Sequence, residues 1–186
     1  MNDIMLDIET LGTSPGYIVT SFCAVPFHLE EDKPGPYDFY QSISISSSLK
    51  NGLKIDPSTM MWWMRQSDKV RDHFAALDHS GQDLKEVLLK FAAFLTHYPP
   101  NPTLWGNGNR FDCGILEGCY KAIGLSSPWT TKLERDMRTY IMGYEHLYEP
   151  SANRETIHDP RKDCLYQIEV LQKVYKLKHP KTSCKD

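Results

Sequence analysis

The stretch that decides the fold is Met1-Asn-Asp-Ile-Met-Leu-Asp7-Ile-Glu9-Thr-Leu-Gly12, at the beginning of the chain. Its short apolar run is typical of a buried β-strand. Asp7 and Glu9 interrupt that run, and because side chains alternate along a strand, both carboxylates project from the same face. Two like charges on one face of a central strand repel each other and resist burial. Mg²⁺, which proteins hold through carboxylates, water and substrate phosphates, would offset them. The pair therefore indicates a metal-dependent site that acts on phosphates.

The same pair has a simpler interpretation. Asp7 and Glu9 could lie at the end of a strand, with both side chains solvated and Gly12 opening a turn. For an isolated Asp-x-Glu pair this interpretation would usually hold. Further carboxylates in matching positions elsewhere in the chain are what favour the metal site.

Length and composition indicate one globular domain. The 186 residues are enough for a single domain with a real core, and we expect it to cover residues 1–186. No apolar run reaches the roughly 20 residues that a membrane-spanning helix needs. The beginning of the chain also lacks the basic and apolar layout of a signal peptide. The expectation is a cytoplasmic protein with no membrane partner.

The cysteine content and the net charge argue against a disulfide-stabilised or zinc-binding protein and against a broad duplex-binding protein. The five cysteines are odd in number and include no Cys-x-x-Cys pair, which argues against a disulfide framework or a zinc site. The net charge of −3 argues against broad, non-specific binding of duplex nucleic acid. It leaves room for an enzyme that holds a few nucleotides through metal ions.

The order of the predicted elements indicates a mixed α/β domain. Three strands with turn-like connections, over the beginning of the chain, residues 17–27 and residues 37–45, form a plausible antiparallel meander. Helices are expected from Asp56-Pro57, from Ser67-Asp68 and over residues 82–97. The rest is a strand over 103–107, a helix over 110–123, a strand within 129–137, a helical patch up to Tyr144, a polar loop over 148–156 and a helix over 158–176. Strands, then helices, then strand–helix units are typical of this fold class.

A third carboxylate follows the fourth predicted strand, in the turn Trp105-Gly-Asn-Gly-Asn-Arg-Phe111-Asp112. A turn of this kind lies at the edge of a sheet, where ligand sites of α/β proteins form. Asp112 falls in the first turn of the following helix, where the helix dipole stabilises its charge. The alternative is that Asp112 only caps the helix.

The last candidate residues lie in the stretch His158-Asp-Pro-Arg-Lys-Asp163-Cys-Leu-Tyr-Gln167-Ile168. Asp163 is expected about one turn into the final helix. Pro160 favours a helix that begins near Asp159, which leaves His158 just outside it. A histidine with a pKa near ~6.5 is suited to take a proton from water. The alternative is an ordinary surface histidine, in a chain that has seven.

Together these motifs resemble a known family. Asp-x-Glu-Thr on the first strand, an asparagine-containing turn that ends in Phe-Asp, and His-x-x-x-x-Asp at the last helix occur in order over nearly the whole chain. The sequence resembles the DEDDh branch of the DnaQ-like 3′-to-5′ exonucleases. The resemblance implies an α/β, ribonuclease H-like mixed β-sheet, three antiparallel strands plus parallel strands, flanked by helices. The stretches Met-Met-Trp62-Trp63-Met-Arg-Gln-Ser and Asp-Cys-Leu-Tyr-Gln are most similar to small phage and bacterial exoribonucleases of the RNase AS-like group.

The resemblance also implies a mechanism. It assigns the binding of two Mg²⁺ or Mn²⁺ ions, about 3.5–4 Å apart, to four carboxylates, and the role of general base to a histidine. The product would be a 5′-nucleoside monophosphate released from the 3′ end. The residues 159–162, Asp-Pro-Arg-Lys, depart from the small and apolar residues that are common there in the family. The implied catalytic set is Asp7, Glu9, Asp112, Asp163 and His158.

Substrate contacts are expected at Glu9, Thr10 and Leu11, which match the positions where the family holds the terminal nucleotide. Trp62 is expected to stack on a base, since aromatic platforms bind single strands with little sequence demand. Plain core packing is the alternative for both tryptophans, and we expect it for at least one of Trp62 and Trp63.

The predicted partners are the 3′ ends of single-stranded RNA or DNA. RNA is favoured on the resemblance alone. The open alternatives are a DNA exonuclease of proofreading or repair type, a catalytically inactive nucleic-acid-binding module, and a stable α/β protein whose acidic residues are incidental. Because related small exonucleases are often homodimers, a homodimer is a further expectation.

Overall fold

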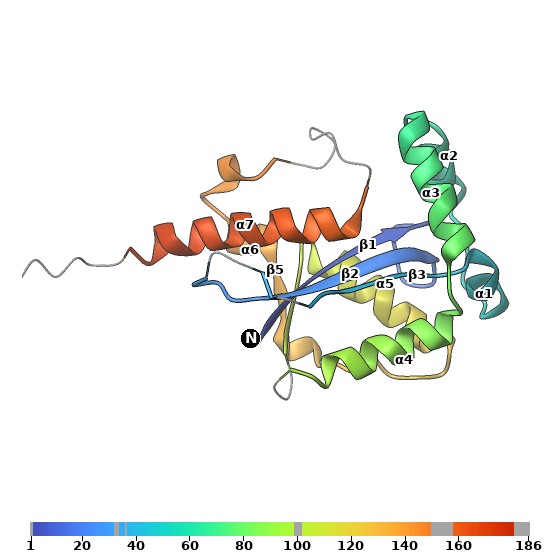
Figure 1. Ribbon diagram of the computed structural model, residues 1–186, viewed down its shortest axis with the longest axis horizontal. Coiled ribbons are helices and arrows are strands. Elements are labelled where there is room, and N and C mark those ends of the chain that lie inside the picture. Colours follow the sequence, from blue (N-terminus) through green and yellow to red (C-terminus); the bar gives the residue numbers. More distant parts are fainter. Residues whose placement is uncertain (1, 32–33, 36, 99–101, 150–157, 181–186) are drawn as a thin grey trace, which may run out of the picture.

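The computed structural model describes residues 2–31, 34–35, 37–98, 102–149 and 158–180. Its centre is a five-stranded sheet with the order β3-β2-β1-β4-β5 (Figure 1). β1 pairs antiparallel with β2, which pairs antiparallel with β3, whereas β1–β4 and β4–β5 are parallel. The expected mixed sheet is therefore confirmed. The strands are β1 (Asp3–Thr10), β2 (Val19–Phe27), β3 (Phe39–Ser42), β4 (Thr103–Gly106) and β5 (Glu134–Asp136).

β1 is the middle strand, and its side chains alternate between two cores. Ile4 and Leu6 belong to the apolar cluster that the helices α4 (Leu84–Leu95) and α5 (Asn109–Ala122) complete. Met5 belongs to the cluster on the opposite face, which α7 (Pro160–Lys178) covers. Asp7 and Glu9 share the parity of Met5, so both carboxylates project toward the face that α7 covers, as the spacing predicts.

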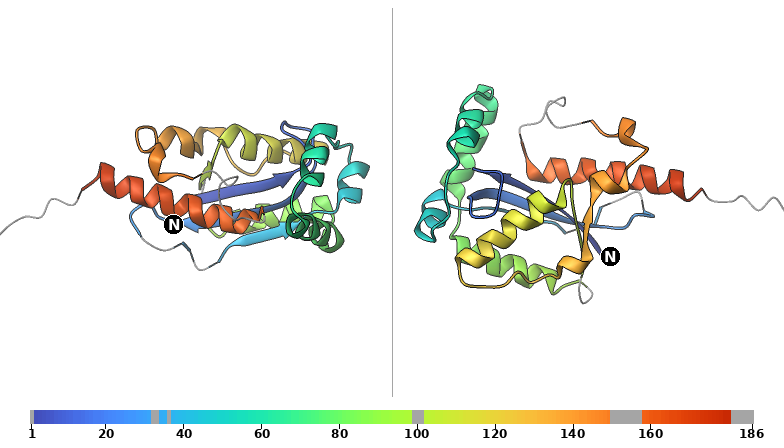
Figure 2. Two further views of the ribbon diagram at one scale, coloured as in Figure 1. Left: turned by 90° about the horizontal axis from the view of Figure 1, so that it is seen from above. Right: turned by 180° about the vertical axis from the view of Figure 1, so that it is seen from behind.

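Helices on both faces close the two cores. In Figures 1 and 2, α7 crosses one face of the sheet, and α4 and α5 lie on the other. Asp83 caps α4 by accepting hydrogen bonds from the backbone N–H groups of Lys85 and Glu86, which satisfies donors that a helix N-terminus leaves unpaired. Side chains that are less than 2% exposed fill the two cores, among them Phe22, Leu88, Phe91 and Leu116 on one side and Cys164, Ile168, Leu171 and Val174 on the other.

Three further helices gather near the end of β1: α1 (Ile45–Lys50), α2 (Pro57–Met64) and α3 (Asp68–Ser80). The expectation of a strand over residues 37–45 was wrong at its end. β3 stops at Ser42, because Ser44 caps a helix by accepting a hydrogen bond from the N–H of Ser47. α2 begins as predicted, with Asp56 as the N-cap.

The C-terminal part forms the last strand and the longest helix. β5 follows a 3₁₀ turn, η1 (Thr131–Leu133), and leads into α6 (Met137–Tyr140) and a second 3₁₀ turn, η2 (Glu145–Leu147). The polar loop expected over 148–156 lies largely outside the described residues. α7 begins at Pro160, with Asp159 as its N-cap, so His158 lies outside the helix as Pro160 indicated. Among the described residues, no helix is both long and apolar enough to cross a membrane.

Candidate active site

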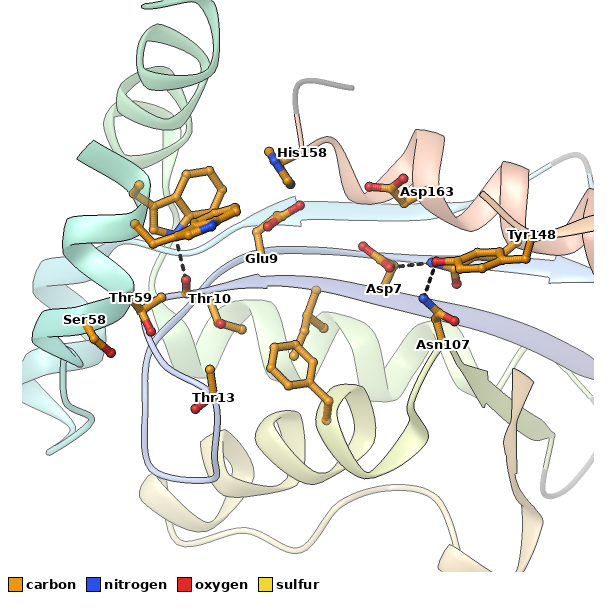
Figure 3. Close-up of a pocket in the computed structure, with 15 residues that line it drawn as sticks. Asp7, Glu9, Thr10, Thr13, Ser58, Thr59, Asn107, Tyr148, His158 and Asp163 are labelled. Atoms are coloured by element: carbon orange, nitrogen blue, oxygen red, sulfur yellow. Dashed lines mark hydrogen bonds between the residues drawn. The ribbon is translucent and has the colours of Figure 1, made fainter. Parts of the chain in front are cut away.

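A cleft of about 520 Å³ opens where β1 ends (Figure 3). Five parts of the chain form its walls: the end of β1, helix α2, the turn between β4 and α5, the segment just after η2, and the beginning of α7. Its lining includes Asp7, Glu9, Thr10, Trp62, His158 and Asp163. Six of the eight residues that the sequence predicts for the site thus share one cavity.

Three carboxylates converge in this cleft. Asp7 and Glu9 come from β1, and Asp163 comes from the first turn of α7. Each offers one oxygen, and these atoms all lie within 4.8 Å of one another. The Asp163 residue is only 5% exposed. Carboxylate oxygens at this spacing are the ligand type that hard divalent cations take.

The electrostatics of the cluster also fit a cation. The pKa of Glu9 is raised well above its ordinary value, first by desolvation and then by the charges of Asp7 and Asp163. Burial and like charges both disfavour the ionised form of a carboxyl group. A divalent cation among these oxygens would reverse that effect, because it favours the charged form. The residues present therefore fit Mg²⁺ or Mn²⁺ by donor type, spacing and charge.

Asp112 lies beside this group and not within it. It is 5% exposed in the first turn of α5 and is absent from the cleft lining, yet its charge still contributes to the raised pKa of Glu9. Desolvation raises the pKa of Asp112 to about 7, although the backbone N–H of Ile8 and the charge of Arg138 act to lower it. A Cβ on Gly106 would lie 2.7 Å from its Oδ2, so this carboxylate is packed directly against β4.

His158 faces the same cleft from the segment before α7. Its backbone has a φ of 53°, an uncommon value for a residue other than glycine. Its ring packs edge-on against Trp62 and Trp63, at centroid distances of 5.0 and 5.6 Å. Desolvation lowers the pKa of His158, and the charge of Asp163 opposes that effect. The imidazole is therefore held largely neutral at pH 7, the form that accepts a proton.

The two tryptophans have different environments. Trp63 is 4% exposed, and its Nε1 donates a hydrogen bond of 2.9 Å to the backbone oxygen of Thr10. Trp63 is thus the core residue that we expected among the pair. Trp62 is 43% exposed and lines the cleft. Its position is compatible with contact to a bound base.

Leu11 lies away from the cleft, unlike the two residues before it. Its side chain is fully buried, its N–H donates to the oxygen of Ile18, and its own oxygen accepts from the N–H of Asp56. Both of its backbone groups are therefore engaged within the protein. Of the three positions expected to hold the terminal nucleotide, Glu9 and Thr10 line the cleft and Leu11 does not.

Sequence reasoning missed six polar residues that line the cleft: Thr13, Ser58, Thr59, Asn107, Tyr148 and Gln167. Gln167 donates from Nε2 to Oδ1 of Asp7 at 2.8 Å, and Asn107 donates from Nδ2 to the hydroxyl of Tyr148 at 2.6 Å (Figure 3). Gln167 follows Asp163 by four positions and so shares its helix face, a signal that was available. Nothing in the local sequence around Tyr148 indicates its place in the cleft.

The sequence of the chain is similar to a family of known proteins. Residues 2–175 match the model of one family, described as the 3′-5′ exoribonuclease Rv2179c-like domain. The chain belongs to this family. The match spans every element from β1 to the greater part of α7. No curated protein sequence matches the chain.

Two solved structures share the fold of this Rv2179c-like domain. One is the crystal structure of cell-death related nuclease 4, with 12% identity and a TM-score of 0.60. The other is the zinc-bound complex of E. coli ExoI with single-stranded DNA, with 14% identity and a TM-score of 0.61. The match covers 94% and 96% of this chain, but only 64% and 41% of those chains. Both likenesses show the ribonuclease H-like fold of the DnaQ-like exonucleases.

Proposed function

We propose that this Rv2179c-like domain is a metal-dependent 3′-to-5′ exonuclease that hydrolyses single-stranded RNA to 5′-nucleoside monophosphates. The observation that carries the proposal is the convergence of Asp7, Glu9 and Asp163 with His158 in one cleft. If the acidic residues were incidental to function, their convergence beside a neutral histidine in one cleft would not be expected.

The carboxylates of Asp7, Glu9 and Asp163 would hold Mg²⁺ or Mn²⁺, with Asp112 alongside and close enough to act on Glu9. Two ions per site is the proposed stoichiometry. The chemistry that such ions supply is a lowered pKa for water and stabilisation of the charge that develops on the leaving oxygen.

His158 is the proposed general base. It would take a proton from the attacking water as the water oxygen bonds to the phosphorus of the last phosphodiester. The bond from phosphorus to the 3′ oxygen breaks, and the 3′ oxygen takes up a proton from solvent. The released products are a 5′-monophosphate and a chain that is one nucleotide shorter and ends in a 3′ hydroxyl. The lowered pKa of His158 supports this role, because the ring stays unprotonated over most of the neutral range.

The choice of RNA follows the description of the family to which the chain belongs. The terminal nucleotide would lie along Glu9 and Thr10, with Trp62 available as a platform for a base. DNA is the competing substrate, because ExoI, a structure of the same fold, is in complex with single-stranded DNA.

A homodimer stays a prediction, and light scattering after size-exclusion chromatography would test it.

The test is digestion of 5′-labelled single-stranded RNA and the matched DNA with Mg²⁺ or Mn²⁺, alongside the Asp112→Asn variant. We expect a descending ladder that begins at the 3′ end, faster on RNA, and absent with the variant. Faster digestion of DNA would overturn the choice of RNA. The absence of a ladder on both strands, with protein that binds metal and is folded, would overturn the exonuclease and favour a binding module.

A further inference from the structure

Gln167 is a buried polar residue that the reaction described above does not use. It lies about one turn after Asp163 on α7, and it is only 2% exposed. Its Nε2 donates a hydrogen bond of 2.8 Å to Oδ1 of Asp7, the bond drawn at Asp7 in Figure 3. Gln167 therefore links the helix that carries one carboxylate of the cluster to the strand that carries two others.

The close approach of α7 to the sheet makes this link possible. Cys164 is fully buried, and its Sγ lies 3.5 Å from the backbone oxygen of Met5 and 3.6 Å from that of Cys23. Cys23 is the residue that faces Asp7 across the β1–β2 pair. The small thiol allows the helix to rest directly on these strands, so that a glutamine one turn further along reaches Asp7.

The surroundings of Gln167 argue against a purely stabilising role. Its Oε1 is buried and has no hydrogen-bond partner within the part of the chain that the structure describes. An acceptor left unpaired in this way lowers the stability of the folded state, whereas an apolar side chain of the same shape would avoid that loss. A polar residue that is unfavourable for stability is typical of a functional site. We therefore relate the role of Gln167 to the hydrogen bond that its Nε2 donates to Asp7.

We propose that Gln167 is a positioning residue that fixes the carboxylate of Asp7 for binding of a divalent cation; this inference rests on the proposed function. A neutral amide is suited to the task, because it donates a hydrogen bond without bringing a positive charge that would compete with the cation. Replacing a residue that orients a metal ligand in this way commonly lowers metal affinity or activity by about 10–100-fold.

The experiment is a titration of the full chain with Mn²⁺, in which free Mn²⁺ is followed by electron paramagnetic resonance. Gln167→Met keeps the shape of the side chain and removes its donor. Gln172→Met is the matched control, since Gln172 is also buried on α7 but donates to the backbone oxygen of His28, away from the cleft. We expect the Kd for Mn²⁺ to rise about 10–100-fold in Gln167→Met and to stay unchanged in Gln172→Met.

Each outcome separates this inference from the function on which it rests. Wild-type protein that binds Mn²⁺, together with Gln167→Met protein that binds it equally well, would overturn the positioning role alone. Wild-type protein that binds no Mn²⁺ would overturn both. Should Gln167→Met fail to fold by circular dichroism, Gln167→Asn retains the amide but is one methylene too short to reach Asp7. The same loss of affinity is then expected, and unchanged affinity would contradict the inference.

Discussion

At the scale of single residues, the chemistry of the cleft depends on how far each carboxyl group is removed from water. Asp7 and Glu9 are half-buried on β1, where they line the cleft, and the alternation of side chains along a strand was enough to predict their shared face. Asp112 is buried more deeply: it is 5% exposed and packed against Gly106, and desolvation raises its pKa to about 7. No sequence pattern shows how deeply a residue in a helical first turn is buried.

The raised pKa of Asp112 makes stability depend on pH. The folded state keeps this proton up to pH about 7, whereas the unfolded state loses it near the ordinary value of 3.8. Between pH 3.8 and about 7, the folded state therefore binds more protons than the unfolded state. The contribution of Asp112 to stability falls as pH rises through this interval and is constant above pH about 7. Glu9, with a raised pKa, acts in the same direction.

We therefore expect Asp112→Asn to become more stable relative to wild type as pH rises from about 4 to about 7 in EDTA, the interval between the ordinary and the raised pKa of Asp112. The neutral amide resembles the protonated acid, so the two proteins should melt at similar temperatures at the acidic end. Calorimetry or thermal melts would measure this difference. A difference in Tm that does not change with pH would show that Asp112 titrates normally.

The contact between Gly106 and Asp112 supplies a second prediction. In Gly106→Ala, the added Cβ meets Oδ2 of Asp112 at 2.7 Å and Oδ1 of Asn109 at 3.0 Å, so the carboxylate must shift. We expect a loss of stability of about 1–3 kcal/mol, which is typical of overpacking, together with a clear loss of exonuclease activity.

Gly114→Ala is the matched control for this variant. Gly114 lies within α5, and apart from its chain neighbours and the backbone of its own helix no atom of the described residues lies within 4 Å of the position that its Cβ would take. Alanine there should stabilise the protein by roughly 0.5–1 kcal/mol and leave activity unchanged. Chemical denaturation and the RNA ladder measure both quantities. Equal behaviour of the two variants would contradict the account of Gly106.

At the scale of elements, α2 joins the wall of the cleft to the core. Trp63 anchors the helix through its hydrogen bond to Thr10, and Trp62, its neighbour, packs against His158 and faces the cleft. The helix start at Asp56-Pro57 was predictable from capping preferences. Which tryptophan faces inward was not, because it depends on how α2 packs against the end of β1.

The two tryptophans should therefore respond differently to truncation. Trp63→Ala is expected to cost about 3–5 kcal/mol of stability, as for other buried aromatic residues. Trp62→Ala should change stability little and raise KM for RNA, since loss of a base platform is worth about 1–3 kcal/mol. Trp62→Phe should recover much of this loss. Denaturation curves and steady-state kinetics would show the contrast, and equal destabilisation by both alanine variants would contradict it.

The bounds of helices and strands are harder to predict from local sequence than the elements themselves. α1 was missed because its sequence, Ile-Ser-Ser-Ser-Leu-Lys, is short and lacks a clear helical period. Its N-cap residue, Ser44, is held by a contact with a distant segment, since its N–H donates to the backbone oxygen of Gln82. α7, by contrast, carries its own start signal in Asp159-Pro160, and its first turn was predicted correctly.

At the scale of the whole molecule, the site exists only when the fold is complete. The acidic cluster takes residues from β1 and α7, which are separated by most of the sequence and meet only through the packed sheet. The ordered motifs predicted this convergence through their resemblance to a family. They did not predict Gln167, because its bond to Asp7 depends on the distance between α7 and the sheet.

A ligand that binds only the folded state raises its stability, by about 2.7 kcal/mol at roughly a hundred times its Kd. Mg²⁺ or Mn²⁺ should therefore raise the Tm of the wild-type protein, and Asp7→Ala should reduce the shift. Asp72→Ala is a suitable control, since Asp72 is an exposed residue of α3 that does not line the cleft. Thermal melts with and without each ion measure the effect. The absence of a shift with both ions would contradict the metal site.

The most direct measurement of the central claim is product analysis by mass spectrometry, with single-stranded RNA, Mg²⁺ and H₂¹⁸O. If the cleft hydrolyses the last phosphodiester through attack by water, nucleoside 5′-monophosphates will appear in order from the 3′ end, each with one ¹⁸O atom on its phosphate. The Asp7→Ala protein will release none. Internal fragments, nucleoside 3′-monophosphates, or unlabelled phosphate groups would contradict the account.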